Sequence, residues 1–189
     1  MIFGITGGTG CGKTTALEAL HSLGGVCLDC DAIYHDLLKT DKALLAAIEG
    51  RFPGVVKAGQ LDRKALGSRV FADPAALADL NTITHAAVKQ RVLKLLPKDG
   101  TPAAIDAIGL FESGLDQLCG VTVGILAPKA DRLRRIMARD GISESYAQMR
   151  LGAQPEDGYF REKCDFILEN TGTEADFLRK SIDFFQKFL

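Results

Sequence analysis

The feature that most constrains the fold of this chain is residues 2–15, with the sequence Ile-Phe-Gly-Ile-Thr-Gly-Gly-Thr-Gly-Cys-Gly-Lys-Thr-Thr. The apolar start predicts a buried strand, the glycines that follow predict a turn, and a helical pattern begins at Lys13. Gly7, Gly12, Lys13 and Thr14 have the spacing G-x-x-x-x-G-K-[ST] of a phosphate-binding loop. We therefore expect an α/β protein that binds a nucleoside triphosphate, and a glycine-rich turn without a ligand is the alternative.

The residue types in this loop suit the binding of phosphate groups. Glycines let the backbone curl so that successive N–H groups point at phosphate oxygens. The helix that follows adds its N-terminal dipole and its unpaired amides to the same anion site. Lys13 would bridge the β- and γ-phosphates, and the Thr14 hydroxyl would ligate Mg²⁺.

Length and composition narrow the class of protein. The 189 residues suit one α/β domain with insertions. Because 23 basic residues balance 24 acidic ones, for a net charge of −1, we expect no general binding to nucleic acid or to a membrane surface. The chain has no apolar run of transmembrane length, and its first residues already belong to the predicted strand, so we expect no signal peptide and a cytoplasmic location.

The cysteines are expected to be reduced thiols, because five of them, an odd number, are spread over the chain. Cys27 and Cys30 form a C-x-x-C pattern, but no second pair is present to complete a zinc site. The pair also lies at the end of a predicted strand, whereas a redox pair normally opens a helix. A metal or redox role is therefore the less favoured interpretation of this pattern.

Two carboxylates follow the second predicted strand. A helix predicted over residues 13–23 leads to that strand at 26–28, and Asp29 and Asp31 come next, at the edge where parallel sheets bind ligands. Residues two apart on an extended chain point to the same side, so both carboxylates would face the site. Asp31 is the candidate general base for a hydroxyl acceptor, and a helix cap is its alternative role.

Residues 32–96 are predicted to be mainly helical, which is too long for an ordinary crossover between two strands. We interpret them as an inserted substrate-binding subdomain. Asp62 and Asp73 are predicted N-caps, the second of them before Pro74. The remaining predictions are strands at 103–108, 121–126 and 166–168, helices at 129–139, after Ser143 and at 173–187, and a polar arm at 155–163.

Three classes of phosphate-loop protein remain: a small-molecule kinase, a GTPase switch and an assembly ATPase. The segment 106–109, Asp-Ala-Ile-Gly, matches the D-x-x-G pattern of GTPases, but the guanine-recognition motif Asn-Lys-x-Asp is absent from the chain. An assembly ATPase would usually be larger. A kinase needs an acceptor base and mobile cations, for which Asp31, Arg139 and Arg150 are candidates. We therefore favour a kinase.

Further motifs follow the phosphate loop in a specific order. They are Leu28-Asp-Cys-Asp31, Gly59-Gln-Leu-Asp-Arg63, Arg69-Val-Phe71 with Asp73, Leu80-Asn-Thr-Ile-Thr-His85, Leu110-Phe-Glu112, Arg139-Asp-Gly141, Arg150 with Gln154, and Asp165 with Asn170. Together with the loop they resemble the dephospho-CoA kinase family over essentially the whole chain. The resemblance implies transfer of the ATP γ-phosphate to the 3′-hydroxyl of dephospho-CoA with Mg²⁺, the final step of coenzyme A biosynthesis.

The resemblance also implies roles for individual residues. Catalysis would rest on Asp31, Lys13 and Arg139, with Asp31 as the base. ATP would be bound by Gly10, Cys11, Gly12, Lys13, Thr14, Thr15, Arg139 and Asn170, and Mg²⁺ by Thr14. Dephospho-CoA would be bound by Asp31, Asp62, Arg63, His85 and Arg150, with a core histidine as the alternative for His85. The chain departs from the family pattern at Cys11, where Ser is common, at Ala86, where Pro is usual, and at Ile108-Gly109-Leu110, where Pro-Leu-Leu is usual.

The expected fold is a P-loop NTPase-type parallel sheet sandwiched by helices, with an inserted helical substrate subdomain and a lid. The expected boundaries are a core of 1–31, 97–138 and 164–189, an insertion of 32–96 and a lid of 139–163. ATP and dephospho-CoA are the expected partners, without nucleic acid or membrane, and the chain would be a monomer or a weak homo-oligomer. The alternatives are a nucleoside or nucleoside-monophosphate kinase and, less favoured, a GTP-dependent switch.

Overall fold

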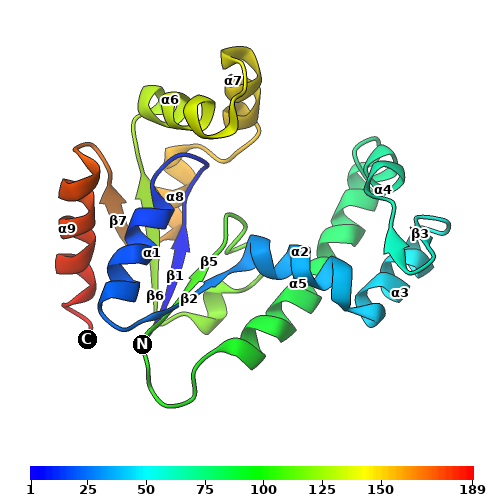
Figure 1. The fold of residues 1–189 in the computed structure, drawn as a ribbon, viewed down its shortest axis with the longest axis horizontal. Coiled ribbons are helices and arrows are strands. Elements are labelled where there is room, and N and C mark those ends of the chain that lie inside the picture. Colours follow the sequence, from blue (N-terminus) through cyan, green and yellow to red (C-terminus); the bar gives the residue numbers. More distant parts are fainter. The chain divides into compact units, whose positions relative to one another are not determined.

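Two units make up the structure, a computed structural model that describes all residues, Met1–Leu189 (Figure 1). The first unit combines Met1–Leu28 with Pro97–Leu189, and the second is the intervening segment Asp29–Leu96. The second unit is therefore an insertion in the sequence of the first. In neither unit does a helix combine the length and the apolar character needed to cross a membrane.

A five-stranded sheet forms the centre of the first unit, with the strand order β2-β5-β1-β6-β7. Strand β1 pairs in parallel with β5 on one side and with β6 on the other, and β6 pairs in parallel with β7. The predicted parallel sheet is therefore confirmed. The strands are β1 (Ile2–Thr6), β2 (Val26–Asp29), β5 (Ala103–Asp106), β6 (Val121–Leu126) and β7 (Phe166–Glu169).

Helices cover the sheet, which explains why its central strands are apolar without alternation. All six residues of β6 are buried. Helices α1 (Lys13–Ser22) and α9 (Glu174–Phe185) pack side by side, and the Phe3 ring of β1 meets the Phe185 ring of α9 edge to face at 4.9 Å (Figure 1). This aromatic core holds β1 in place, and the phosphate loop follows directly from β1.

Helices α6 (Lys129–Asp140) and α7 (Glu144–Gly152) form a small layer of their own in the first unit. Gly141, with a φ of 63°, ends α6, and Ser143 caps α7 as predicted. Their contact buries a separate apolar cluster centred on Ile136, Ala147 and Leu151. The two helices are therefore held together by packing that is independent of the main core.

The prediction of a polar arm over residues 155–163 was wrong, because Asp157–Lys163 forms helix α8. Phe160 is fully buried there, and the helix packs against β6 and β7. A single buried aromatic in seven residues is too short a pattern to show helical periodicity in the sequence. A short 3₁₀ helix, η1 (Asp116–Leu118), precedes β6.

The second unit is a helical group organised around α5 (Pro74–Leu95), which contacts α2 (Cys30–Thr40), α3 (Lys42–Arg51) and α4 (Arg63–Val70). The predicted N-caps are confirmed: Asp62 accepts a hydrogen bond from Ala65 N, and Asp73 from Ala75 N. The unit also contains an antiparallel hairpin of β3 (Val56–Lys57) and β4 (Gln60–Leu61) that the sequence analysis missed.

The hairpin has a recognisable turn. Ala58 and Gly59 join its strands with φ angles of 49° and 76°, so both central residues have positive φ, as in the tight turns that suit a two-residue hairpin. Each strand has only two residues, which leaves too little alternation to predict them from sequence.

Candidate active site

The loop between β1 and α1 has the backbone of a phosphate-binding loop. Gly7, Gly10 and Gly12 have φ angles of 142°, 80° and 102°, a region that residues with a side chain rarely adopt. A Cβ atom on Gly7 would also overlap the Ile125 carbonyl oxygen of β6, and one on Gly12 would overlap the Asn170 side chain. The glycines are therefore required both for the turn and for close packing against neighbouring elements.

Lys13 lies between its own loop and the end of a neighbouring strand. Its Nζ donates to the Gly7 carbonyl oxygen at 3.3 Å and lies 3.9 Å from Asp106 Oδ1. Asp106 is the last residue of β5, and in the sheet it lies opposite Ile5 of β1. The ammonium group therefore stands at the carboxyl edge of the sheet beside a carboxylate, where charged ligands of parallel sheets bind.

Asp106 is a candidate site residue that the sequence did not reveal. In the sequence it is marked only as part of a D-x-x-G pattern, which belongs to the GTPase alternative. A signal was present, since an acidic residue ends an apolar strand there. Its place beside the phosphate loop follows from the strand order, in which β5 is the direct neighbour of β1.

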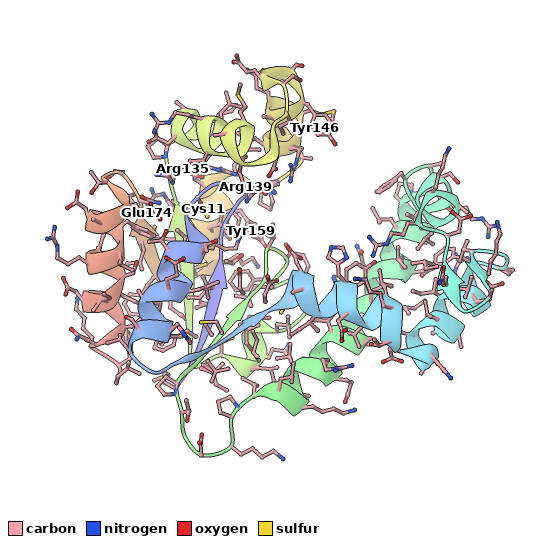
Figure 2. The ribbon with its side chains drawn as sticks, in the orientation of Figure 1. Cys11, Arg135, Arg139, Tyr146, Tyr159 and Glu174 are labelled. Atoms are coloured by element: carbon pink, nitrogen blue, oxygen red, sulfur yellow. The ribbon has the colours of Figure 1, made fainter.

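Three successive carbonyl groups of the loop are held by side chains from distant parts of the chain. Arg132 Nε donates to Thr9 O at 3.0 Å, and Arg135 Nη1 donates to Gly10 O at 3.2 Å. Asn170 Nδ2 donates to Cys11 O at 2.9 Å, and its backbone N–H bonds to Leu126 O at 2.7 Å. Figure 2 shows Arg135 on α6 near the loop residue Cys11.

This arrangement gives Asn170 a role that the sequence analysis did not foresee. The residue was predicted to contact ATP, but its side chain is buried and joins the loop to Arg135, whose Nη2 lies 3.4 Å from Asn170 Oδ1. The structure therefore shows a residue that supports the loop, and a direct contact with the nucleotide stays a prediction. The neighbouring Cys11 is also buried, and this burial raises the pKa of its thiol.

The other predicted loop residues follow from the helix start. Thr14 is exposed in the first turn of α1, and Thr15 is buried below it. Gly10 and Gly12 lie in the loop itself. Gly10, Cys11, Gly12, Lys13, Thr14 and Thr15 are thus brought together, as their adjacency in sequence requires, and Asn170 joins them through the fold.

The two predicted lid arginines share one carboxylate. Arg139 donates to Asp140 through Nε at 2.7 Å and Nη2 at 3.0 Å, and Arg150 Nη1 donates to Asp140 Oδ2 at 2.6 Å. These hydrogen bonds lower the pKa of Asp140 to about 2. Arg139 lies on α6 (Figure 2), and Arg150 is near the end of α7. The structure therefore brings the two cations together, on exposed surface of the first unit.

The remaining predicted site residues lie in the second unit. The expectation that Asp29 and Asp31 would both lie on extended chain was wrong, because α2 already begins at Cys30. Asp29 is the N-cap and accepts from Ala32 N at 2.9 Å, so it is this residue that has the capping role considered for Asp31. Asp31 lies in the first helical turn and is exposed, where a carboxylate interacts favourably with the helix dipole.

Asp62, Arg63 and His85 are placed on two helices. Asp62 caps α4 and forms an ion pair with Lys57 at 3.2 Å, so its carboxylate already has a structural role. Arg63 begins α4 and is close enough to Tyr34 on α2 to act on the pKa of its hydroxyl, although burial is the larger effect and raises that pKa. His85 is half-buried in the middle of α5.

The family model described as dephospho-CoA kinase matches residues 1–176. A dephospho-CoA kinase from Anaeromyxobacter dehalogenans is 37% identical over 177 residues, which cover 90% of this chain and 84% of that protein.

Solved structures show the same relationship. A Thermus thermophilus structure named TT1252 matches with a TM-score of 0.84 and 32% sequence identity. The match covers 100% of this chain and 97% of the Thermus thermophilus chain. A dephospho-CoA kinase from Campylobacter jejuni has a TM-score of 0.71 and 32% identity, with coverages of 99% and 96%. The match to the family model, the relative in sequence and these two structures span nearly the whole chain, including the phosphate loop and the inserted unit. The chain therefore belongs to the dephospho-CoA kinase family.

Proposed function

We propose that this protein transfers the γ-phosphate of ATP to the 3′-hydroxyl of dephospho-CoA and so forms coenzyme A. Membership of the family over residues 1–176 supports both substrates. The structural observation that carries the proposal is the position of Lys13, which lies at the carboxyl edge of the sheet within 3.9 Å of Asp106, inside a loop of the correct backbone form.

The donor half of the site is assigned to the first unit. The amides from Gly10 to Thr15 and the N-terminus of α1 would surround the phosphates. Lys13 would exchange its bond to the Gly7 carbonyl for one to a phosphate oxygen, which is favourable because a charged acceptor binds an ammonium more strongly than a carbonyl does. Arg139, together with Arg150, would neutralise charge on the transferred phosphoryl group.

The residues present fit Mg²⁺. Kinases bind this ion through one or two protein oxygens together with substrate phosphates, so no dedicated cluster of ligands is needed. The oxygen donors at this site are the Thr14 hydroxyl, at the start of α1, and the Asp106 carboxylate, at the end of β5. We propose that these two residues hold the ion, which supplies charge neutralisation for the transferred phosphoryl group.

The acceptor half is assigned to the second unit, Asp29–Leu96, with Arg150 of α7. Asp31 would accept the proton of the attacking hydroxyl, a role that its exposed place in the first turn of α2 allows. Asp62, Arg63 and His85 would bind dephospho-CoA. We further propose the boundaries 1–31, 97–138 and 164–189 for the core, which places Asp31 at the junction with the acceptor insertion of 32–96, and 139–163 for a lid.

Partners other than the two substrates are not needed for this activity. We propose a cytoplasmic enzyme that is a monomer or a weak homo-oligomer and binds neither nucleic acid nor membrane. The near balance of charge, a net value of −1, supports this part of the proposal.

One experiment tests the proposal against other phosphate-loop kinases and against a GTP-dependent switch. The purified protein is incubated with Mg²⁺ and either ATP or GTP, in the presence of dephospho-CoA, nucleosides or nucleoside monophosphates, and the products are separated by chromatography. Formation of coenzyme A from ATP and dephospho-CoA is expected, with Lys13→Ala as the background control. Rapid phosphorylation of a nucleoside or nucleotide without coenzyme A formation would contradict the proposal.

A further inference from the structure

We infer that Arg132 and Gln154 are positioning residues of the phosphate loop, which they hold through a set of hydrogen bonds to Thr9. We call Thr9, Arg132 and Gln154 together the Thr9 clamp. Through it, the geometry of the loop depends on the segment between α7 and α8, to which Gln154 belongs. The inference uses the proposed function only in that ATP is the ligand of the loop.

Thr9 is bound at three of its polar atoms. Its backbone N–H donates to Gln154 Oε1 at 2.8 Å, and its Oγ1 accepts from Gln154 Nε2 at 2.6 Å. Its carbonyl oxygen accepts from Arg132 Nε at 3.0 Å, and Arg132 Nη2 also donates to Gln154 Oε1 at 3.2 Å. The side chains of Gln154 and Arg132 therefore fix the orientation of both peptide groups of Thr9.

The orientation matters because a peptide group is planar and trans, so its N–H points away from its C=O. The carbonyl of Thr9 points outward to Arg132, and the N–H of Gly10, which is in the same peptide group, must point to the opposite side. Asn170 holds the carbonyl of Cys11 and fixes the N–H of Gly12 in the same way. These N–H groups belong to the loop that would surround the phosphates.

The charge of Arg132 adds to this effect. A cation on a carbonyl oxygen polarises the peptide group and makes its N–H a better donor to an anion. Arg132 is only 8% exposed, and its ion pair with Asp157 is long, at 3.8 Å. The hydrogen bonds of this buried guanidinium are to Thr9 and Gln154. Its structural role is therefore to hold the loop.

The clamp is tested by the affinity for ATP with Mg²⁺, measured by calorimetry without any acceptor. Gln154→Met keeps the length of the side chain and removes both bonds to Thr9, and we expect affinity to fall by about tenfold. Thr9→Val removes only the hydroxyl and should cost about threefold, whereas Thr9→Ser keeps the hydroxyl and should bind like the wild type. Because Gln154→Met already removes the partner of the Thr9 hydroxyl, the double variant Thr9→Val with Gln154→Met should bind no more weakly than Gln154→Met alone.

Controls come from α6, which carries Arg132, and from α7, which ends two residues before Gln154. Arg134 is exposed and pairs with Asp131 three residues away, and Gln148 bonds to Glu144 on its own helix. Arg134→Met replaces an arginine of α6, and Gln148→Met replaces a glutamine of α7. Neither side chain bonds to the loop. Both should bind ATP like the wild type.

Hydrogen exchange supplies a second measurement on the same variants. The Thr9 amide should be protected in the nucleotide-free wild type and should exchange fast in Gln154→Met, because Gln154 is its acceptor. Unchanged ATP affinity in Gln154→Met, or effects that simply add in the double variant, would overturn the inference. A lower melting temperature with unchanged affinity would do the same, since it would show a structural role only.

The outcomes separate this inference from the proposed function. If Gln154→Met does not fold, the pair Thr9→Val and Thr9→Ser decides, and equal affinity of the two would overturn the clamp. If the wild type binds ATP but does not phosphorylate dephospho-CoA, the proposed function fails. The ATP affinities of the variants then decide whether the clamp is correct. If the wild type binds no ATP, both fail.

Discussion

At the scale of single residues, Asp140 organises the two predicted lid arginines. One of its oxygens accepts from Arg139 Nε, and the other accepts from both Arg139 Nη2 and Arg150 Nη1. Two guanidinium groups that bind one carboxylate would repel each other without it. A single acidic side chain therefore holds the two cations together.

The pH dependence of this group can be predicted in sign. The pKa of Asp140 is lowered to about 2 in the folded protein by the hydrogen bonds from both arginines. A lowered folded pKa gives stability that is fully present above the unfolded value of about 3.9 and is lost as the pH falls toward the folded value. We expect Asp140→Asn to be less stable than the wild type at pH 7, and the difference to shrink below about pH 4.

Urea unfolding of both proteins between pH 3 and pH 7 measures this difference. High salt should also reduce it at pH 7, because the group is exposed and its ion pairs are screened. A stability difference that grows as the pH falls would contradict the assignment.

Asp31 is the residue on which the proposed acid–base chemistry rests. Asp31→Asn removes the base but keeps the size of the side chain, so turnover should fall by about 10²–10⁴ while ATP affinity stays unchanged. Asp36→Asn is the matched control, because Asp36 is an exposed carboxylate on the same helix and pairs with Arg91 of α5. Steady-state kinetics and ATP calorimetry check both variants, and full activity of Asp31→Asn would remove it as the base.

At the scale of elements, the start of α9 shows how a local motif supports the distant phosphate loop. Thr173 and Asp176 form a capping box in which each side chain bonds to the backbone N–H of the other residue. The helix that they begin packs on α1 and places Phe177 and Phe185 in the core below β1. A cap far from the site in sequence thus stabilises the two elements that flank the loop.

The stability of this element can be tested without touching the chemistry. Thr173→Ala should lower the free energy of unfolding by about 1 kcal/mol and leave turnover unchanged at 25 °C. Thr82→Ala is the control, because Thr82 bonds only to a carbonyl of its own helix α5 and alanine is the better helix former. Urea unfolding measures both, and an equal loss in the two variants would show that the cap contributes nothing specific.

At the scale of the whole molecule, most of the residues proposed for the donor half and for the acceptor half lie in different units, with Arg150 as the exception. The loop residues and the predicted lid arginines belong to the first unit, whereas Asp31, Asp62, Arg63 and His85 belong to the second. The second unit has its own helical core around α5. If the proposal is right, donor and acceptor affinity should respond independently to substitutions in the two units.

Arg63→Ala tests this independence. Arg63 is an exposed cation at the start of α4, and its loss should raise the KM for dephospho-CoA by about tenfold without changing the Kd for ATP. Lys64→Ala is the matched control, because Lys64 is the next exposed cation on the same helix. Equal effects of the two substitutions, or a change in ATP affinity, would contradict a specific role of Arg63 in binding the acceptor.

The sequence by itself determined those features that depend on neighbouring residues. The phosphate loop, the start of α1 at Lys13 and the caps at Asp62, Asp73 and Ser143 were predicted correctly. A cap or a glycine turn is made by hydrogen bonds and φ angles within about four residues, so its residue types alone reveal it. Where the local pattern was short, as for α8 and the β3–β4 hairpin, the prediction failed.

Only the tertiary structure decided which distant side chains serve the loop. The partners of Thr9 and Cys11 are 123, 145 and 159 residues away in the sequence, and nothing in their own neighbourhoods marks Arg132 or Gln154 as residues that hold the loop. These contacts depend on the strand order that puts β5 and β6 on either side of β1, and on the packing of α6 and α7. The loop could be predicted from its residues because its backbone conformation depends on neighbouring residues. The side chains that hold it are determined by the packing of the whole first unit.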